Sequence, residues 1–102
     1  MMHTRYSRQI LFAPIGEAGQ KKLMRASVLI VGAGALGSWA IDMLARAGVG
    51  KMKIVDRDYV EESNLQRQQL YSMKDVEQKL PKAVAAKARV LQINSSVEIE
   101  EY

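Results

Sequence analysis

Three glycines and one aspartate have the spacing of residues that bind a nucleotide. Gly32, Gly34 and Gly37 form a G-x-G-x-x-G pattern after an apolar run, and Asp56 lies 19 residues beyond the last glycine. Gly32 can make the tight turn, Gly34 can admit a phosphate to the backbone, and Gly37 can let a helix pack closely. A carboxylate at the position of Asp56 accepts hydrogen bonds from ribose hydroxyls. The pattern predicts a bound nucleotide rather than an ordinary structural turn.

A polar segment follows that aspartate and changes the kind of nucleotide expected. It contains Asp58, Asn64 and Arg67. A dehydrogenase has little use for these side chains, whereas a triphosphate needs cationic and amide donors. The segment therefore favours ATP over NAD. The alternative for Arg67 is a surface ion pair with Glu61 or Glu62, and for Asp58 it is a loop cap or indirect support of a magnesium site, of which we favour the cap.

The elements that must position these residues can be read from the apolar pattern. The run 27–31 has the composition of a central parallel strand buried on both faces. A helix is expected over 35–47, with Gly48 as its C-terminal stop and Asp42 and Arg46 as an i,i+4 ion pair. Its apolar positions are Leu36, Ala40, Met43, Leu44 and Ala47. The next strand covers 51–56.

The remainder of the chain repeats the helix and strand pattern. The connection 57–80 is long and polar, so we expect it to be functional and to contain short helices. Pro81 can start a helix over 82–93, and 97–100 alternates like a third strand. Lys82 opposes the helix dipole at this position, which suggests a nearby phosphate or carboxylate. The predicted class is α/β: an arm with a short helix over 1–26, then a β-α-β-α-β nucleotide-binding half over 27–102.

Composition limits the classes of protein that remain. The 102 residues are 48% hydrophobic and 25% charged, with no cysteine, no long apolar run and no secretory signal pattern. The formal charge of +4 comes without a basic stripe or aromatic platform. We therefore expect a cytoplasmic protein that binds neither nucleic acid nor membrane. A doubly wound fold has two such halves, so the natural protein is expected to continue beyond residue 102, and this segment alone should expose an apolar sheet edge.

Several ordered motifs together resemble one family. RYSRQ, VLIVGAGALGS, AGVG, IVDRDYVEESNLQRQ and LPKA occur in this order along almost the whole chain. They are similar to the ThiF/MoeB/HesA group of adenylating enzymes, which are related to ubiquitin-activating enzymes. The resemblance implies the N-terminal half of a doubly wound adenylation domain. It also implies an enzyme that uses ATP and Mg²⁺ to adenylate the C-terminal glycine carboxylate of a ubiquitin-like sulfur-carrier protein, as in thiamine or molybdenum-cofactor biosynthesis.

The resemblance assigns roles to individual residues. The three glycines would form the nucleotide loop and Asp56 would bind the ribose, with Asp58 beside it. Asn64, Arg67 and Lys82 would hold phosphates, and Arg8 would reach into the site of a partner protomer, so that the active unit is a homodimer. The carrier is expected to end in Gly-Gly. The family's magnesium-binding aspartate, zinc-binding cysteines and thiol cysteine would lie beyond residue 102, so no metal ligand is expected here and the chain alone should be inactive.

Two other functions share part of the pattern. An NAD-dependent oxidoreductase domain would use the glycine loop and Asp56 but would leave Asn64 and Arg67 without a role. A non-catalytic nucleotide-binding or dimerisation module would be favoured if the chain naturally ended at residue 102.

Overall fold

The structure, a computed structural model, describes residues 2–102, with side chains from Thr4 onward. Within this range three parallel strands form one sheet in the order β1 (Ser27–Val31), β2 (Lys51–Val55) and β3 (Glu98–Glu101). Their register aligns Val28 with Met52, and Met52 with Ile99. The predicted α/β class with a parallel sheet is confirmed.

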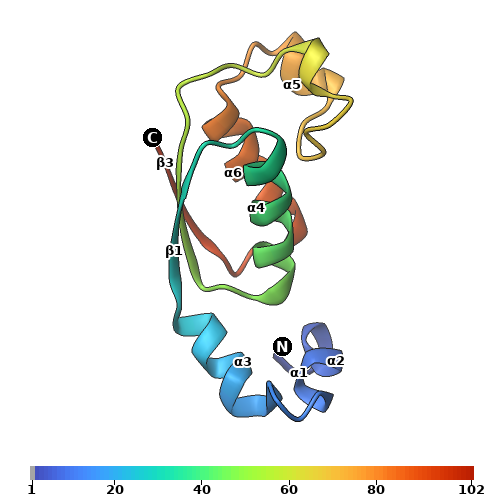
Figure 1. The fold of residues 1–102 in the computed structure, drawn as a ribbon, viewed down its shortest axis with the longest axis vertical. Helices are drawn as coiled ribbons and strands as arrows, with labels where there is room; N and C mark the ends of the chain where they lie inside the picture. Colours follow the sequence, from blue (N-terminus) through green and yellow to red (C-terminus); the bar gives the residue numbers. More distant parts are fainter. Residues whose placement is uncertain (1) are drawn as a thin grey trace.

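Two helices cover one face of this sheet. Helices α4 (Ala35–Ala47) and α6 (Lys82–Ile93) contact each other and the strands, on the right of the sheet in Figure 1. Between them lies the core, where Ile41 of α4, Met52 and Ile54 of β2, and Val90 of α6 are fully buried. The core therefore fixes how the two crossover helices sit above the strand ends.

Short helices lie at the two ends of the molecule. The N-terminal arm contains α1 (Met2–Arg5), α2 (Ser7–Leu11) and α3 (Gly16–Arg25), where the sequence predicted one short helix. The long connection after β2 contains the 3₁₀ helix η1 (Glu62–Asn64) and α5 (Met73–Glu77), as expected. In Figure 1 the arm lies at the bottom and α5 at the top of a molecule 42 Å long.

The first strand is not buried on both faces as predicted. Within residues 2–102 β1 pairs only with β2, and its side chains alternate between half-buried and exposed. Leu29 and Val31 point away from the helices, and Val31 is 76% exposed. The reason is that α4 and α6 cover a single face of the sheet. The expected apolar sheet edge is thus present along β1.

Helix α4 has the predicted extent, but a different face of it is buried. Ser38, Ile41 and Ala45 pack inward, whereas Leu36 and Met43 are exposed. The predicted end at Gly48 is confirmed, because this residue has a left-handed φ of 95°. The predicted ion pair is confirmed as well, with 3.0 Å between Arg46 Nε and Asp42 Oδ1.

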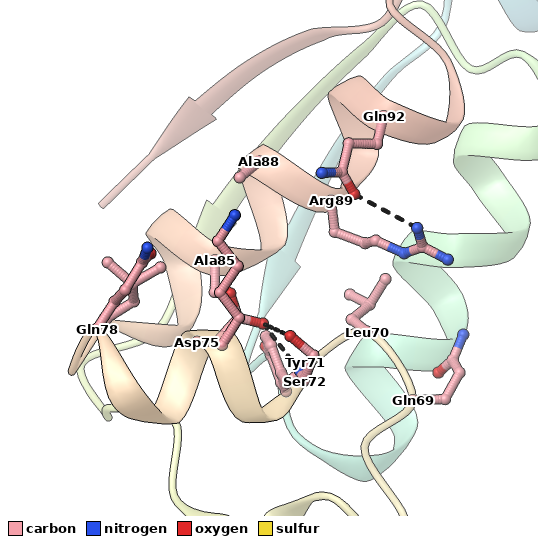
Figure 2. Close-up of a pocket in the computed structure, with 12 residues that line it drawn as sticks. Gln69, Leu70, Tyr71, Ser72, Asp75, Gln78, Ala85, Ala88, Arg89 and Gln92 are labelled. Atoms are coloured by element: carbon pink, nitrogen blue, oxygen red, sulfur yellow. Dashed lines mark hydrogen bonds between the residues drawn. The ribbon is translucent and has the colours of Figure 1, made fainter.

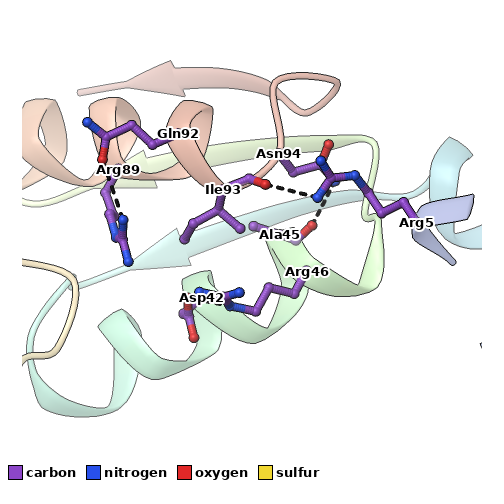
Figure 3. A network of polar contacts seen from close by, with 8 residues as sticks. All are labelled: Arg5, Asp42, Ala45, Arg46, Arg89, Gln92, Ile93 and Asn94. Atoms are coloured by element: carbon purple, nitrogen blue, oxygen red, sulfur yellow. Dashed lines mark hydrogen bonds and ion pairs between the residues drawn. The ribbon is translucent and has the colours of Figure 1, made fainter. Parts of the chain in front are cut away.

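Buried polar contacts attach the N-terminal arm to the α/β unit. The Asn94 side-chain amide donates to the Tyr6 hydroxyl at 2.8 Å and to the Ala45 carbonyl at 2.9 Å, and Asn94 itself is buried. Arg5 donates to the Ile93 carbonyl at 2.9 Å (Figure 3). Since buried polar groups need partners, these bonds fix the arm at the amino ends of the strands.

None of the helices in residues 2–102 combines the length and the apolar character needed to cross a bilayer.

Candidate nucleotide-binding site

The glycine loop connects the end of β1 to the first turn of α4. Gly32 has a left-handed φ of 89°, and its N–H donates to the Val55 carbonyl at 2.8 Å. A Cβ on Gly37 would lie 2.9 Å from the Gly32 carbonyl carbon and still closer to its oxygen. The absence of a side chain at Gly37 therefore lets α4 start directly over the turn. The N–H groups of that first turn have no acceptor within the helix and can bind an anion.

Asp56 binds this loop through its carboxylate. Oδ2 accepts the Ala33 N–H at 2.7 Å, and Oδ1 accepts the Asp58 N–H at 2.7 Å. The capping acceptor is thus Asp56, and the cap that we predicted for the Asp58 side chain is not observed. Each carboxylate oxygen retains a lone pair for a further donor, so these bonds leave capacity for a ribose hydroxyl.

The polar segment folds back over the same end of the sheet. Asn64 is buried, and its side-chain oxygen accepts the Glu61 N–H at 3.0 Å. Arg67 is exposed and donates to the Ser63 carbonyl at 3.3 Å. Within residues 4–102 it makes no ion pair with Glu61 or with its neighbour Glu62. The guanidinium therefore keeps most of its donors for a ligand.

Gln68 is a site residue that our reading of the sequence missed. It is 3% exposed, and its Oε1 has no hydrogen-bond partner among the described residues. Its Nε2 would lie 4.0 Å from a Cβ on Gly34, so the amide borders the open space in front of the loop. One feature of the sequence could have predicted it. Gln68 lies four residues after Asn64, a spacing that places two side chains on the same side of a helical turn. Nε2 is the donor on the side of this space and can donate to an anion that enters it, whereas Oε1 would need a donor.

Lys82 is buried without an opposite charge. Its backbone N–H donates to the Asp58 carbonyl at 2.8 Å, and Val60 N–H donates to the Leu80 carbonyl at 3.0 Å, so the start of α6 is held beside the end of β2. The Lys82 side chain is only 7% exposed, yet no hydrogen bond or ion pair of its ammonium is found within residues 4–102. The fully buried, unpartnered side-chain atoms of the described residues are Gln68 Oε1 and Gln69 Oε1, so Lys82 Nζ keeps contact with solvent while its stem is buried. The ammonium is therefore available to an anion.

Arg8 is not brought to this site. It lies in α2, exposed, and its side chain makes no hydrogen bond or ion pair within the part of the chain whose side chains are described. The arm occupies the end of the molecule opposite the loop that connects β1 to α4 (Figure 1). Arg8 therefore does not belong to the nucleotide site of its own chain in this structure.

The acidic residues of the described segment do not form a metal centre. No group of three His, Cys, Asp or Glu side chains is positioned to hold an ion within residues 4–102. We assign none of these residues to the magnesium that the resemblance implies.

Taken together, the parallel sheet and the glycine loop at its carboxyl edge define an α/β protein with the layout of the doubly wound nucleotide-binding folds. The sequence profile of the ThiF family matches residues 6–102. This chain belongs to the ThiF family.

Two curated relatives are similar over almost the whole chain. This chain is 62% identical over 98 residues to the sulfur carrier protein ThiS adenylyltransferase of Bacillus subtilis. The aligned region covers 96% of this chain and 29% of the relative. The chain is 46% identical over 98 residues to the sulfur carrier protein adenylyltransferase of Thermus thermophilus, covering 96% of the chain and 35% of the relative. The chain thus spans about a third of the length of these relatives.

A solved structure supports the same assignment. MccB of E. coli, crystallised with ATP, superposes with a TM-score of 0.87 at 35% sequence identity. The match covers 97% of this chain and 30% of that one. This similarity extends the family relationship to the three-dimensional fold.

Proposed function

We propose that this chain forms the nucleotide-binding part of an ATP-dependent adenylyltransferase. Its substrate is the C-terminal glycine carboxylate of a ubiquitin-like sulfur-carrier protein ending in Gly-Gly. The names of the Bacillus and Thermus relatives support the carrier as substrate. The pathway that the carrier serves is thiamine or molybdenum-cofactor biosynthesis. The observation that carries the proposal is Lys82, whose stem is buried and whose ammonium has no acidic partner within residues 4–102, so that a phosphate can pair with it. Since the reaction consumes ATP, we place it in the cytoplasm.

The residues support this reaction by electrostatics rather than by acid or base chemistry. A carboxylate oxygen of the carrier attacks the α-phosphorus of ATP, the bond to the pyrophosphate oxygen breaks, and acyl-adenylate and pyrophosphate form. The carboxylate is already ionised at neutral pH, so no base is needed. Attack brings two anions together, and Arg67 and Lys82 would lower that repulsion and stabilise the leaving pyrophosphate. Asn64 and Gln68 would orient the phosphates, and Asp56 the ribose.

Arg67→Ala tests whether the ligand is ATP. We expect the chain to bind ATP and not NAD, and the variant to bind ATP about tenfold more weakly, because it loses one charge-assisted contact. Isothermal titration with both nucleotides measures this. Arg57→Ala, which removes an exposed arginine near the site, is the control and should change affinity less than twofold, roughly the effect of a surface charge. Binding of NAD instead of ATP would establish the oxidoreductase alternative.

Arg8→Ala tests whether this arginine serves a second copy. The assay uses a hybrid in which this chain replaces the matching segment of the Bacillus relative, with ThiS as carrier and pyrophosphate exchange into ATP as readout. We expect Arg8→Ala to lower the rate about 100-fold, as removal of an electrostatic contact to the reacting group does. Coexpression with a Lys82→Met hybrid should restore about a quarter of the activity, since each mixed dimer contains one intact site. No recovery would overturn a role for Arg8 in the site of a second copy.

A further inference from the structure

A tyrosine outside the family motifs contacts the glycine loop directly. Tyr71 lies in the segment that follows Arg67 and Gln68, and its ring is only 6% exposed. Its hydroxyl donates to the Ala33 carbonyl at 2.6 Å. Ala33 is the fully buried residue between the two glycines of the turn. The bond thus joins residues that are 38 positions apart in the sequence.

Both backbone polar groups of Ala33 are therefore held by side chains. The N–H donates to Asp56 Oδ2 at 2.7 Å, and the carbonyl accepts from Tyr71. Asp56 comes from the end of β2, whereas Tyr71 comes from the connection after it. Flexible glycines on either side cannot fix the turn themselves, so these two bonds define its conformation.

The same tyrosine holds the segment that would bind the phosphates. Its N–H donates to the Gln68 carbonyl at 3.3 Å, which puts Tyr71 and Gln68 in one turn. Gln68 in turn borders the open space at Gly34. The hydroxyl bond consequently fixes the glycine loop and the phosphate-binding segment relative to each other.

The ring of Tyr71 belongs to the hydrophobic core and also borders a cavity. Tyr71 lines a cavity of about 310 Å³ between α5 and α6, whose other lining residues include Leu70, Asp75 and Arg89 (Figure 2). Core packing therefore places the ring, and the hydroxyl bond connects that placement to the glycine loop. Burial, with smaller contributions from the carboxylates of Asp56 and Asp75, raises the pKa of Tyr71. The phenol therefore remains a donor at neutral pH.

We propose that Tyr71 is a positioning residue for ATP, whose hydroxyl holds the glycine loop and the segment bearing Arg67 and Gln68 in their binding arrangement. The proposal rests on the proposed function. The Tyr71 hydroxyl would not contact ATP itself. It would align the residues that contact the triphosphate before ATP binds.

Tyr71→Phe removes the hydroxyl and keeps the ring. We expect the dissociation constant for ATP to rise about tenfold, because the loop carbonyl loses its donor and the aligned state is less populated. In the Bacillus hybrid, KM for ATP should rise by a similar factor while KM for ThiS stays unchanged. The matched control is Tyr59→Phe, whose side chain is 58% exposed and makes no hydrogen bond among the described residues. It should leave both constants unchanged.

Amide hydrogen exchange tests the bond between Tyr71 and Ala33 in the absence of any nucleotide. The Ala33 N–H should exchange about tenfold faster in Tyr71→Phe, with no such change in Tyr59→Phe. Faster exchange without ATP binding by the unsubstituted chain would overturn the proposed function and retain the positioning of the loop. Unchanged ATP affinity in Tyr71→Phe, while the unsubstituted chain binds ATP, would overturn the positioning role. Equal exchange rates would overturn it as well.

Discussion

Lys82→Met is expected to lower adenylation by the Bacillus hybrid about 1,000-fold while leaving the melting temperature unchanged or higher. The loss of rate follows from removing a cation at the position where pyrophosphate charge develops. The retained stability follows because the buried part of Lys82 is its apolar stem, whereas its ammonium has no partner within residues 4–102. Methionine keeps the packing of that stem and breaks no ion pair. Pyrophosphate exchange and thermal unfolding of the same samples measure the two effects.

The control for this substitution lies on the same helix. Lys87 is partly exposed and pairs with Glu101 at 3.1 Å, so Lys87→Met should change the exchange rate less than about twofold. A structural lysine would behave in the opposite way at position 82: its loss would reduce stability and leave ATP binding intact. That result would remove Lys82 from the site and with it the main support for an anionic ligand.

The order of elements could be predicted because local signals decide it. The glycine turn, the stop at Gly48, the helix after Pro81 and the parallel strands each follow from the spacing of a few residues. Exposure could not be predicted in the same way. The apolar run of β1 is compatible with burial on both faces, yet whether each face is covered depends on neighbours that its five residues do not specify. Helix α4 has apolar residues on several sides, so periodicity identified the helix but not its buried face.

In the candidate site, too, some residues could be predicted from local sequence motifs and others could not. Residues that would touch phosphate belong to recognisable motifs, and the backbone bond from Lys82 to the Asp58 carbonyl holds the start of α6 just beyond β2. Residues that act through the backbone gave no such signal. The bond from Tyr71 to Ala33 joins residues 38 positions apart. It forms only when the whole intervening segment has folded, and the spacing of residue types does not predict such a contact. Asp56 likewise caps the loop in place of Asp58 because its side chain points back across the strand ends.

A pair of alanine substitutions in the glycine loop should separate folding from binding. Gly37→Ala is expected to destabilise the chain by about 2–3 kcal/mol, which lowers the melting temperature by about 10 °C or more. The added Cβ meets the carbonyl group of Gly32, and backbone atoms cannot rotate away as a side chain can. Thermal unfolding followed by circular dichroism measures this loss. An unchanged melting temperature would mean that α4 can move off the turn, contrary to the close packing described above.

Gly34→Ala should have the opposite profile. Among the described residues a Cβ there meets nothing nearer than Gln68 Nε2 at 4.0 Å, so we expect the melting temperature to change by less than about 5 °C. The methyl group would occupy the space through which a phosphate approaches the loop, so ATP affinity should fall about 100-fold by titration. If Gly34→Ala bound ATP normally, the phosphates would not lie against this turn. Both variants add the same methyl group, at Gly37 against a backbone carbonyl and at Gly34 into open space. The difference between their melting temperatures and ATP affinities therefore separates what the two glycines contribute.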